Sequence, residues 1–233
     1  MQIKYMEKQI VGPLERVKII GEKRSVETLA KFDTGASNNS IDYKIAATAG
    51  VGPIISSVKI KNAFTKNKIV RRPVTRMRME IRNIKFNTKA NLEDRLKRNV
   101  HVLIGRNIIR KHFIIDVSGR YKRLPKISLH ETVTLKAIKE KTLKAKIDTG
   151  AEITSIDSSL AKQIGVEITG IKKISSSSGS KKRRIGYLDL KIKGMIIKNV
   201  KCNIVNRSHM KYAILIGKNV LKDNFLVDLE SGK

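Results

Sequence analysis

The sequence has one cysteine, Cys202, among its 233 residues. A lone cysteine excludes an intrachain disulfide, argues against a cysteine-based zinc site and favours a reducing, cytoplasmic location. Tryptophan is absent and aromatic residues make up only 4% of the chain, which leaves little for a surface that stacks nucleic-acid bases. No segment reaches the roughly 18 consecutive apolar residues of a membrane helix, and residues 1–11 lack the apolar run of a secretory signal. We therefore expect no contact with a membrane.

Acidic residues are also scarce. The chain has 20 Asp and Glu against 50 Lys and Arg, which gives a formal net charge of +30. Such a field attracts polyanions, whether nucleic acid, acidic protein segments or anionic lipid, and it does not choose among them. A solvated basic surface without a partner explains the same charge equally well. Hydrophobic residues at 40% indicate a globular protein with a buried core.

The sequence contains an internal duplication. Residues 33–42 return at 148–157 with an offset of 115, and residues 102–109 return at 214–221 with an offset of 112. Two single residues repeat at the second offset as well, Asn91 and Arg95 as Asn203 and Arg207. A repeat of this kind indicates two copies of one structural unit.

The duplication predicts two lobes, at residues 1–120 and 121–233, with a linker near Val117–Pro125. The change of offset places three additional residues in the first lobe, between Val51 and Asn91. An exposed loop or hairpin tolerates such an insertion best. Each lobe is small for an independent core, and packing of the two lobes across a pseudo-twofold axis would solve that problem. We expect a monomer that is an intramolecular pseudo-dimer.

Short strands with alternating apolar and polar residues dominate the pattern, as in Met77–Ile81. Apolar strands also run into the two repeated aspartates, over Leu29–Phe32 and Leu143–Ile147. Two short helices are predicted after these loops, Tyr43–Ala49 and Ser158–Ile164, ended by Gly50 and Gly165. Two more are predicted with asparagine N-caps, Asn107–Phe113 and Asn219–Phe225. The fold class is therefore mainly β with short helices.

The repeated motif begins Asp-Thr-Gly-Ala, at Asp33 and at Asp148. One such loop is typical of an ordinary turn, whereas two copies in equivalent places favour a functional pair. Two carboxylates about 3 Å apart share one proton, so that one can act as general base on water while the other donates to a substrate carbonyl. The glycine in each motif allows a close backbone approach, and the threonine hydroxyls could lock the two loops together.

These motifs carry a resemblance to a known family. Asp-Thr-Gly-Ala is followed by Ile-Gly-Arg/Lys-Asn, whose glycine lies 72 residues after Asp33 in the first copy and 69 after Asp148 in the second. This pattern resembles the retropepsins, the retroviral-type aspartic proteases. The wider pattern, with Asn-x-x-x-Arg before this block and Phe-x-x-Asp after it, is similar to a prokaryotic retropepsin-like family. That family is often labelled as an ATP-dependent zinc protease and is associated with glutamate-ligase genes.

The resemblance implies two retropepsin-like (acid protease) β-barrel lobes related by a pseudo-twofold axis. It makes Asp33 and Asp148 the catalytic pair. It also implies an interlocked threonine pair, Thr34 and Thr149, and two glycines that support the loops from beneath, Gly105 and Gly217. The loop backbone that it places near the substrate belongs to Gly35, Ala36, Gly150 and Ala151.

The resemblance further implies a flap hairpin in each lobe. By position the flaps fall near Val58–Val70 and Ile174–Ile185, with tips at Ala63, Phe64 and Thr65 and at Ser177, Ser178 and Gly179. Retroviral enzymes pair an acid after the motif with the arginine of Gly-Arg-Asn. Glu152 with Lys218 keeps a version of that pair, whereas Ser37 with Arg106 does not, which leaves Arg106 for the substrate or another partner.

Neither zinc nor ATP is expected. The four histidines, His101, His112, His130 and His209, form no metal-binding motif, and no phosphate-binding loop is present. We therefore expect no metal and no cofactor.

Basic runs flank the expected flaps, at Arg71–Arg72, Arg76, Arg78 and Lys181–Arg184. They could steer acidic peptides into a cleft. The association of the resembled family with glutamate-ligase genes makes glutamyl-rich tails one hypothesis for the substrate. A solvated strand face explains them equally well.

Two functions from different classes remain open. The first is an aspartic endopeptidase that hydrolyses peptide bonds with the two aspartates, with a preference for acidic substrates as an open hypothesis. The alternative is a non-catalytic retropepsin-like module that binds RNA, the ribosome or another polyanion. In a third arrangement, two chains exchange halves to build two sites.

Overall fold

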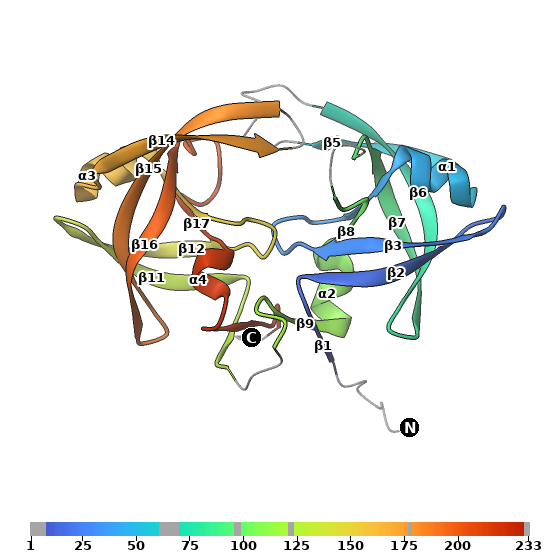
Figure 1. Cartoon of the computed structure of the whole chain (residues 1–233), viewed down its shortest axis with the longest axis horizontal. Coiled ribbons are helices and arrows are strands. Elements are labelled where there is room, and N and C mark those ends of the chain that lie inside the picture. The colour runs from blue at the N-terminus through green and yellow to red at the C-terminus, as the bar shows by residue number, and fades with distance from the viewer. Residues whose placement is uncertain (1–7, 61–69, 96–98, 121–123, 177–178, 231–233) are drawn as a thin grey trace. The chain divides into compact units, whose positions relative to one another are not determined.

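The computed structural model of the chain describes residues 8–60, 70–95, 99–120, 124–176 and 179–230, with the backbone alone at 173–176 and 179–181. The chain divides into two compact units, Met1–Ile115 (unit 1) and Asp116–Lys233 (unit 2), which are coloured blue to green and green to red in Figure 1. The predicted fold class is confirmed, because each unit is a closed β-barrel with short helices. The pseudo-twofold axis stays a prediction.

Six strands close the barrel of unit 1, and an extra strand, β5 (Ile54–Ile60), pairs with β6 as a hairpin. In order around the barrel they are β2 (Leu14–Ile20), β3 (Ser25–Phe32), β8 (Val102–Ile104), β4 (Asn39–Asp42), β7 (Ile84–Glu93) and β6 (Val70–Ile81), which pairs back to β2. A separate parallel pair joins β1 (Gln9–Val11) to β9 (Phe113–Asp116).

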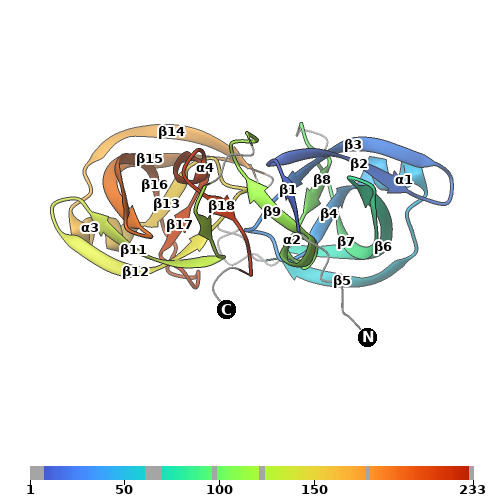
Figure 2. The same cartoon turned by 90° about the horizontal axis from the view of Figure 1, so that it is seen from below.

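Unit 2 repeats this order with equivalent strands, and the ring of strands in each unit can be followed in Figure 2. They are β11 (His130–Lys136), β12 (Glu140–Ile147), β17 (Ile214–Ile216), β13 (Thr154–Asp157), β16 (Met195–Val205) and β15 (Gly179–Ile192), which pairs back to β11. The hairpin strand is β14 (Ile168–Ser176), and a parallel pair joins β10 (Lys126–Ile127) to β18 (Leu226–Val227).

Alternating side chains explain why these segments are barrel strands. In β6, Met77, Met79 and Ile81 are buried in the core, while Arg76 before Met77 and Arg78 after it are exposed. A strand places successive side chains on opposite faces, so this pattern fills the barrel interior and leaves the arginines in water.

Two of the predicted helices are confirmed, α1 (Tyr43–Ala49) and α3 (Ser158–Ile164). Each begins after an aspartate that accepts a hydrogen bond from a backbone amide two residues on, and each ends at a glycine with φ of 76° or 75°. Glycine adopts this left-handed conformation without a steric penalty from Cβ.

The asparagine N-caps predicted for the other two helices are wrong. The helices are α2 (Arg106–His112) and α4 (Lys218–Leu221), and their N-caps are Gly105 and Gly217. Phe113 already belongs to strand β9, and Phe225 lies beyond the end of α4. The asparagine side chains are used for tertiary hydrogen bonds instead, as described below.

The structure locates the three additional residues of the first repeat. Between the paired residues Ile60 and Val70 the β5–β6 connection is three residues longer than the connection between Ile174 and Lys181 in β14–β15. Unit 1 has one more residue before β5, and unit 2 has one more residue in β16, at an irregularity near Asn199 (φ 54°). These two differences cancel. The insertion therefore lies at the end of the hairpin.

Candidate active site

The Asp33 loop follows β3 directly. Asp33 donates its backbone amide to the carbonyl oxygen of Ile104 (2.9 Å), which ties the loop to β8. Its Oδ1 accepts hydrogen bonds from the amides of Gly35 (2.7 Å) and Ala36 (3.2 Å). These two donors fix the orientation of the carboxylate.

The Asp148 loop of unit 2 has the same local geometry. Its backbone amide donates to the carbonyl oxygen of Ile216 (3.0 Å), and its Oδ1 accepts from the amide of Gly150 (2.8 Å). In both loops the following threonine, Thr34 or Thr149, is fully buried. Each unit therefore holds one aspartate in an equivalent, preorganised loop.

Gly105 and Gly217 lie under these loops, where a side chain would not fit. A Cβ on Gly105 would lie 2.5 Å from the carbonyl oxygen of Asn38, and one on Gly217 would lie 2.7 Å from the carbonyl carbon of Ile153. The next residue in each unit donates its amide to the motif alanine, from Arg106 to Ala36 (3.0 Å) and from Lys218 to Ala151 (2.8 Å). Close packing of backbone against backbone thus stabilises each aspartate loop.

Different side chains complete this support in the two units. In unit 1, buried Asn39 accepts from the amide of Gly105 (3.0 Å) and donates to the carbonyl oxygen of Lys89 (3.2 Å). In unit 2, Thr154 takes the position of Asn39; its Oγ1 accepts from the amide of Gly217 (3.2 Å) and donates to Oδ1 of Asn219 (3.0 Å). The sequence reasoning missed Asn39 and Thr154, which differ between the repeats and so gave no signal.

The basic residue after each of these glycines binds its own loop. Arg106 donates through Nη1 to the carbonyl oxygens of Thr34 (2.8 Å) and Gly35 (3.0 Å), and through Nη2 to Oγ of Ser37 (2.5 Å). In unit 2, Nζ of Lys218 lies 2.7 Å from Oε1 of Glu152. The guanidinium thus braces the loop without an acidic residue at position 37.

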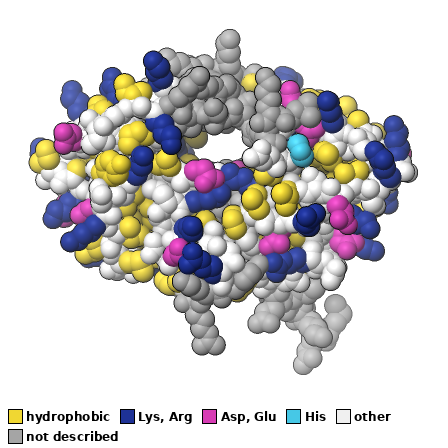
Figure 3. Space-filling view, viewed as in Figure 1, with side chains coloured by type: hydrophobic (Ala, Val, Ile, Leu, Met, Phe, Trp, Pro, Cys, Tyr) yellow, Lys and Arg dark blue, Asp and Glu magenta, His cyan; other side chains and the backbone are white. Residues whose placement is uncertain are grey.

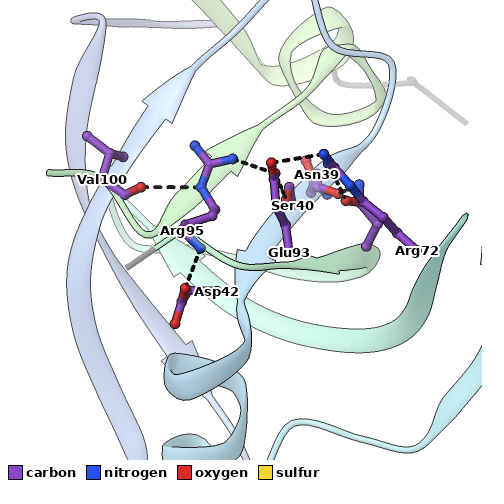
Figure 4. Close-up of polar contacts among 8 residues, drawn as sticks. Asn39, Ser40, Asp42, Arg72, Glu93, Arg95 and Val100 are labelled. Atoms are coloured by element: carbon purple, nitrogen blue, oxygen red, sulfur yellow. Dashed lines mark hydrogen bonds and ion pairs between the residues drawn. The ribbon is translucent and has the colours of Figure 1, made fainter. Parts of the chain in front are cut away.

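A buried ion-pair network lies next to Asn39 in unit 1 (Figure 4), where the carbonyl oxygen of Asn39 accepts from Nδ2 of Asn91 (2.8 Å). The carboxylate of Glu93 binds Nη2 of Arg72 (2.9 Å), Nη1 of Arg95 (2.9 Å) and Oγ of Ser40 (3.0 Å). Arg72 also donates to Oδ1 of Asn91 (3.3 Å). Glu93 and Arg95 are 8% and 3% exposed, so the carboxylate offsets one of the two positive charges beside it in a low-dielectric environment.

The sequence reasoning assigned no role to this network. The signal that could have found it was the repeat of Asn91 and Arg95 as Asn203 and Arg207. Arg72 belongs by sequence to the basic runs, yet it is partly buried and ion-paired, whereas Arg71, Arg76, Arg78 and Arg184 are exposed as a solvated strand face requires.

The backbone amide of the repeated arginine makes an equivalent hydrogen bond in both units. The backbone amide of Arg95 donates to Oδ2 of Asp42 (2.7 Å), and that of Arg207 donates to Oδ2 of Asp157 (2.6 Å). Burial acts to raise the pKa of Asp157, but hydrogen bonds from the Ser159 hydroxyl and from the amides of Arg207, Ser159 and Leu160 outweigh it, and the net pKa is lowered. Asp157 is thus a structural carboxylate that caps α3.

The expected flaps fall on the two hairpins, β5–β6 and β14–β15. Ala63, Phe64 and Thr65 lie outside the described residues, and so do Ser177 and Ser178. Gly179 is the first residue of β15 and pairs with Ser176. The assignment of these hairpins as flaps stays a prediction.

No group of three or more His, Cys, Asp or Glu side chains that could hold a metal ion occurs among the described residues. The histidines have other surroundings. His112 packs edge-on against Phe86 (5.0 Å between centroids), and burial followed by the charge of Lys111 lowers its pKa. His130 stacks on Tyr212 (4.8 Å). These contacts are those of packing residues.

Lysine and arginine side chains are spread over the face of both units in view in Figure 3, with fewer acidic ones among them. Within the ranges that the structure describes, no helix is long and apolar enough to cross a membrane.

Comparison with known proteins identifies the class of fold. Residues 136–223 match the sequence model of a family described as "gag-polyprotein putative aspartyl protease". This range lies in unit 2 and includes Asp148, Glu152 and Gly217. Together with the closed barrels, this match supports a retropepsin-like fold. The search of curated proteins gives no match.

Two solved structures show a weak likeness. A Legionella pneumophila protein of unknown function, Lpg0085, is 21% identical over 45% of this chain and 92% of its own, with a TM-score of 0.30. The foamy viral protease-reverse transcriptase, solved in complex with an RNA/DNA hybrid, is 18% identical over 42% of this chain and 12% of its own, with a TM-score of 0.30. At these TM-scores neither likeness carries an argument about this chain.

Proposed function

We propose that this protein is an aspartic endopeptidase in which Asp33 and Asp148 form one catalytic pair. The observation that carries the proposal is the equivalence of the two loops. Each unit holds one aspartate carboxylate after a barrel strand, oriented by the glycine amide two residues on at 2.7 Å in unit 1 and 2.8 Å in unit 2. The aspartyl-protease match over residues 136–223 supports it.

In the proposed mechanism the two carboxylates share one proton. The ionised member takes a proton from water as the water attacks the peptide carbonyl, and the protonated member donates to the carbonyl oxygen. As the C–N bond breaks, the proton taken from water passes to the leaving nitrogen, and the other carboxylate takes back a proton from the hydroxyl of the intermediate. Arg106, Gly105 and Gly217 act as positioning residues, because they hold the loops that carry the aspartates. Thr34 and Thr149 would interlock beneath the pair.

The test is single substitution of each aspartate. Asp33→Asn and Asp148→Asn should each lower kcat for cleavage of a peptide library by at least about a hundredfold, because general acid–base catalysis contributes on the order of 10²–10⁴. Asp223→Asn is the control; Asp223 is partly exposed and lies 3.6 Å from Arg120. The wild-type pH–rate profile should be bell-shaped, reporting the pair rather than either residue. Cleavage that survives in the double variant would refute the proposal.

A second candidate rests on the net charge of +30. As a non-catalytic module the protein would bind RNA, the ribosome or another polyanion through its basic surface. Nucleic-acid binding whose affinity falls steeply with salt, together with no cleavage of any library peptide, would favour this candidate over the protease.

The finer assignments belong to the same proposal. We place the chain beside the prokaryotic retropepsin-like proteins associated with glutamate-ligase genes, with lobes at 1–120 and 121–233, acting as a cytoplasmic monomer. Light scattering in solution separates one chain from two, and a dimer would favour exchange of lobes between chains.

A further inference from the structure

The two units differ at one position in an otherwise repeated polar cluster. The strand register makes Val205 of unit 2 the equivalent of Glu93 of unit 1, because Glu93 pairs with Asp42 and Val205 pairs with Asp157. The other members of the cluster are the same residue type in both units: Ser40 and Ser155, Arg72 and Arg183, Asn91 and Asn203, Arg95 and Arg207.

In unit 1 the Glu93 carboxylate completes the cluster. It binds Arg72 and Arg95 at 2.9 Å each, and the arrangement of the three side chains is visible in Figure 4. Unit 2 keeps the arginines and has a half-buried valine where this carboxylate would be. A buried guanidinium gains most from a carboxylate that it can bind with two parallel hydrogen bonds.

Arg207 is buried and held in place by two hydrogen bonds. It is 5% exposed, its amide donates to Asp157 and its Nε donates to the carbonyl oxygen of Tyr212 (3.0 Å). These contacts fix the residue through its backbone amide and Nε, and they do not use the terminal nitrogens Nη1 and Nη2. Among the described residues no carboxylate lies within ion-pair distance of this guanidinium.

A neighbouring atom shows that the cluster is incomplete. Oδ1 of Asn203 is buried and has no hydrogen-bond partner in the described part of the chain, and Asn203 is 4% exposed. In unit 1 the same atom of Asn91 accepts from Arg72 while Arg72 binds Glu93. A carboxylate that draws Arg183 into the orientation of Arg72 would also bring a donor to Asn203, which removes the cost of an unsatisfied buried acceptor.

The cluster adjoins the aspartate loop of its unit. Burial lowers the pKa of Arg207, Asp148 acts to raise it, and Arg183 acts to lower it again. Both Asp148 and Arg183 are therefore close enough to Arg207 for their charges to act on it. A group bound at Arg207 would therefore lie within range of the charge of the aspartate that we assign to catalysis.

We propose that unit 2 carries a carboxylate-binding subsite beside Asp148, in which Arg207 and Arg183 bind an acidic side chain of the substrate at the position that Glu93 occupies in unit 1. The ligand is a carboxylate rather than another anion, because unit 1 provides the same cluster with a carboxylate already bound. That the ligand is a substrate side chain rests on the proposed function, whereas carboxylate binding does not.

The test introduces the missing carboxylate into the chain itself. Val205→Glu should occupy the subsite, and Val205→Gln adds the same bulk without charge. Binding is measured by calorimetry with a blocked hexaglutamate peptide, using full-length protein with Asp33→Asn so that no cleavage intervenes. Val205→Glu should weaken binding at least about tenfold, as expected for loss of charge-assisted hydrogen bonds, and Val205→Gln should change it by less than about threefold.

A charge control separates this subsite from the general basic field. Ile196→Glu places the same charge on an exposed position of β16, 61% exposed, and should leave binding within about twofold because exposed charges are screened. Equal loss in Ile196→Glu and Val205→Glu, or no loss in Val205→Glu, would overturn the subsite. If Val205→Glu does not fold, Arg183→Gln provides the second variant, with the same tenfold loss expected.

The two proposals fail separately. Without any cleavage by wild-type protein, but with the predicted loss in Val205→Glu, the protease proposal falls and the carboxylate subsite stands. With cleavage that is equal for glutamate and glutamine peptides and unaffected by Val205→Glu, the protease stands and the subsite falls.

Discussion

The two units build the same aspartate loop from partly different residues. The backbone contacts agree closely, from Asp33 to Ile104 and from Asp148 to Ile216. The side chains that hold the loop do not, since Asn39 in unit 1 is replaced by Thr154 together with Asn219 in unit 2. The comparison teaches that the loop geometry was kept while its support changed.

The polar cluster shows the opposite relation. Its residues are repeated except at Glu93 and Val205, and that one difference turns a closed, internally paired network into one with an unsatisfied buried oxygen at Asn203. A duplicated chain can in this way keep one copy of a cluster for stability and use the other for recognition. Three predictions test how far the units have diverged.

The largest effect is expected at Glu93. Glu93→Val gives unit 1 the residue that unit 2 has, and leaves Arg72 and Arg95 without their carboxylate. Removing one partner of a buried ion pair costs about 3–5 kcal/mol, so the free energy of unfolding from urea titration should fall by that amount.

A surface pair serves as the control for that measurement. Glu140→Gln removes the exposed partner of Lys136, at 3.3 Å and 58% exposed, and should cost less than about 1 kcal/mol. If Glu93→Val costs no more than Glu140→Gln, the unit 1 network does not stabilise its unit.

A smaller effect on the free energy of unfolding is expected for the two basic residues that follow Gly105 and Gly217, and it should differ between the units. Arg106→Gln removes two hydrogen bonds to the carbonyl oxygens of the Asp33 loop, and hydrogen bonds from a charged group contribute roughly 1.5–3 kcal/mol. Lys218→Gln removes a pair with Glu152, which is 71% exposed, and surface pairs contribute about 0–1 kcal/mol. Urea titration of both variants should therefore show the larger loss for Arg106→Gln, and the reverse order would contradict the assigned contacts.

The smallest effect concerns acid stability. The lowered pKa of Asp157 means that its ionised form stabilises the fold at pH above its ordinary value of 3.8, and that this contribution is lost as pH falls from there through the folded pKa. Ser159→Ala removes one hydrogen bond to the carboxylate, Oγ to Oδ1 at 2.5 Å, and should lower the free energy of unfolding at pH 7 by about 1 kcal/mol.

The same variant should weaken the dependence on pH. Below pH 4 the free energy of unfolding should fall less steeply in Ser159→Ala than in wild type, measured by urea titration at several pH values. Unit 1 has Lys44 at the equivalent position and so lacks this hydroxyl, and Lys44→Ala is the matched control in which the acid slope stays as in wild type. An unchanged slope in Ser159→Ala would show that the hydroxyl does not hold the Asp157 carboxylate.

Local pattern determined much of the fold. The alternation of Met77, Met79 and Ile81 with polar residues predicted a strand, and the glycines after α1 and α3 predicted where those helices end. These features follow from the side-chain period of a strand and from the freedom of glycine at positive φ, both of which act within a few residues. The duplication likewise predicted two similar units, because two copies of one sequence pattern form the same local elements in the same order.

Tertiary structure decided the rest. Asn107 and Asn219 were predicted as helix N-caps, but the N-caps are the glycines Gly105 and Gly217. The asparagine amides make tertiary hydrogen bonds instead, from Asn107 to Thr88 and from Asn219 to Lys201. Arg72 read as part of a basic surface, and only the pairing of β6 with β7 brings it to Asn91 and Glu93. Contacts between residues about 20 positions apart depend on the strand register, which no local pattern specifies. The sequence by itself therefore determined the two similar units and their aspartates. The difference between Glu93 in unit 1 and Val205 in unit 2 matters only because the folded sheets place arginines beside these positions.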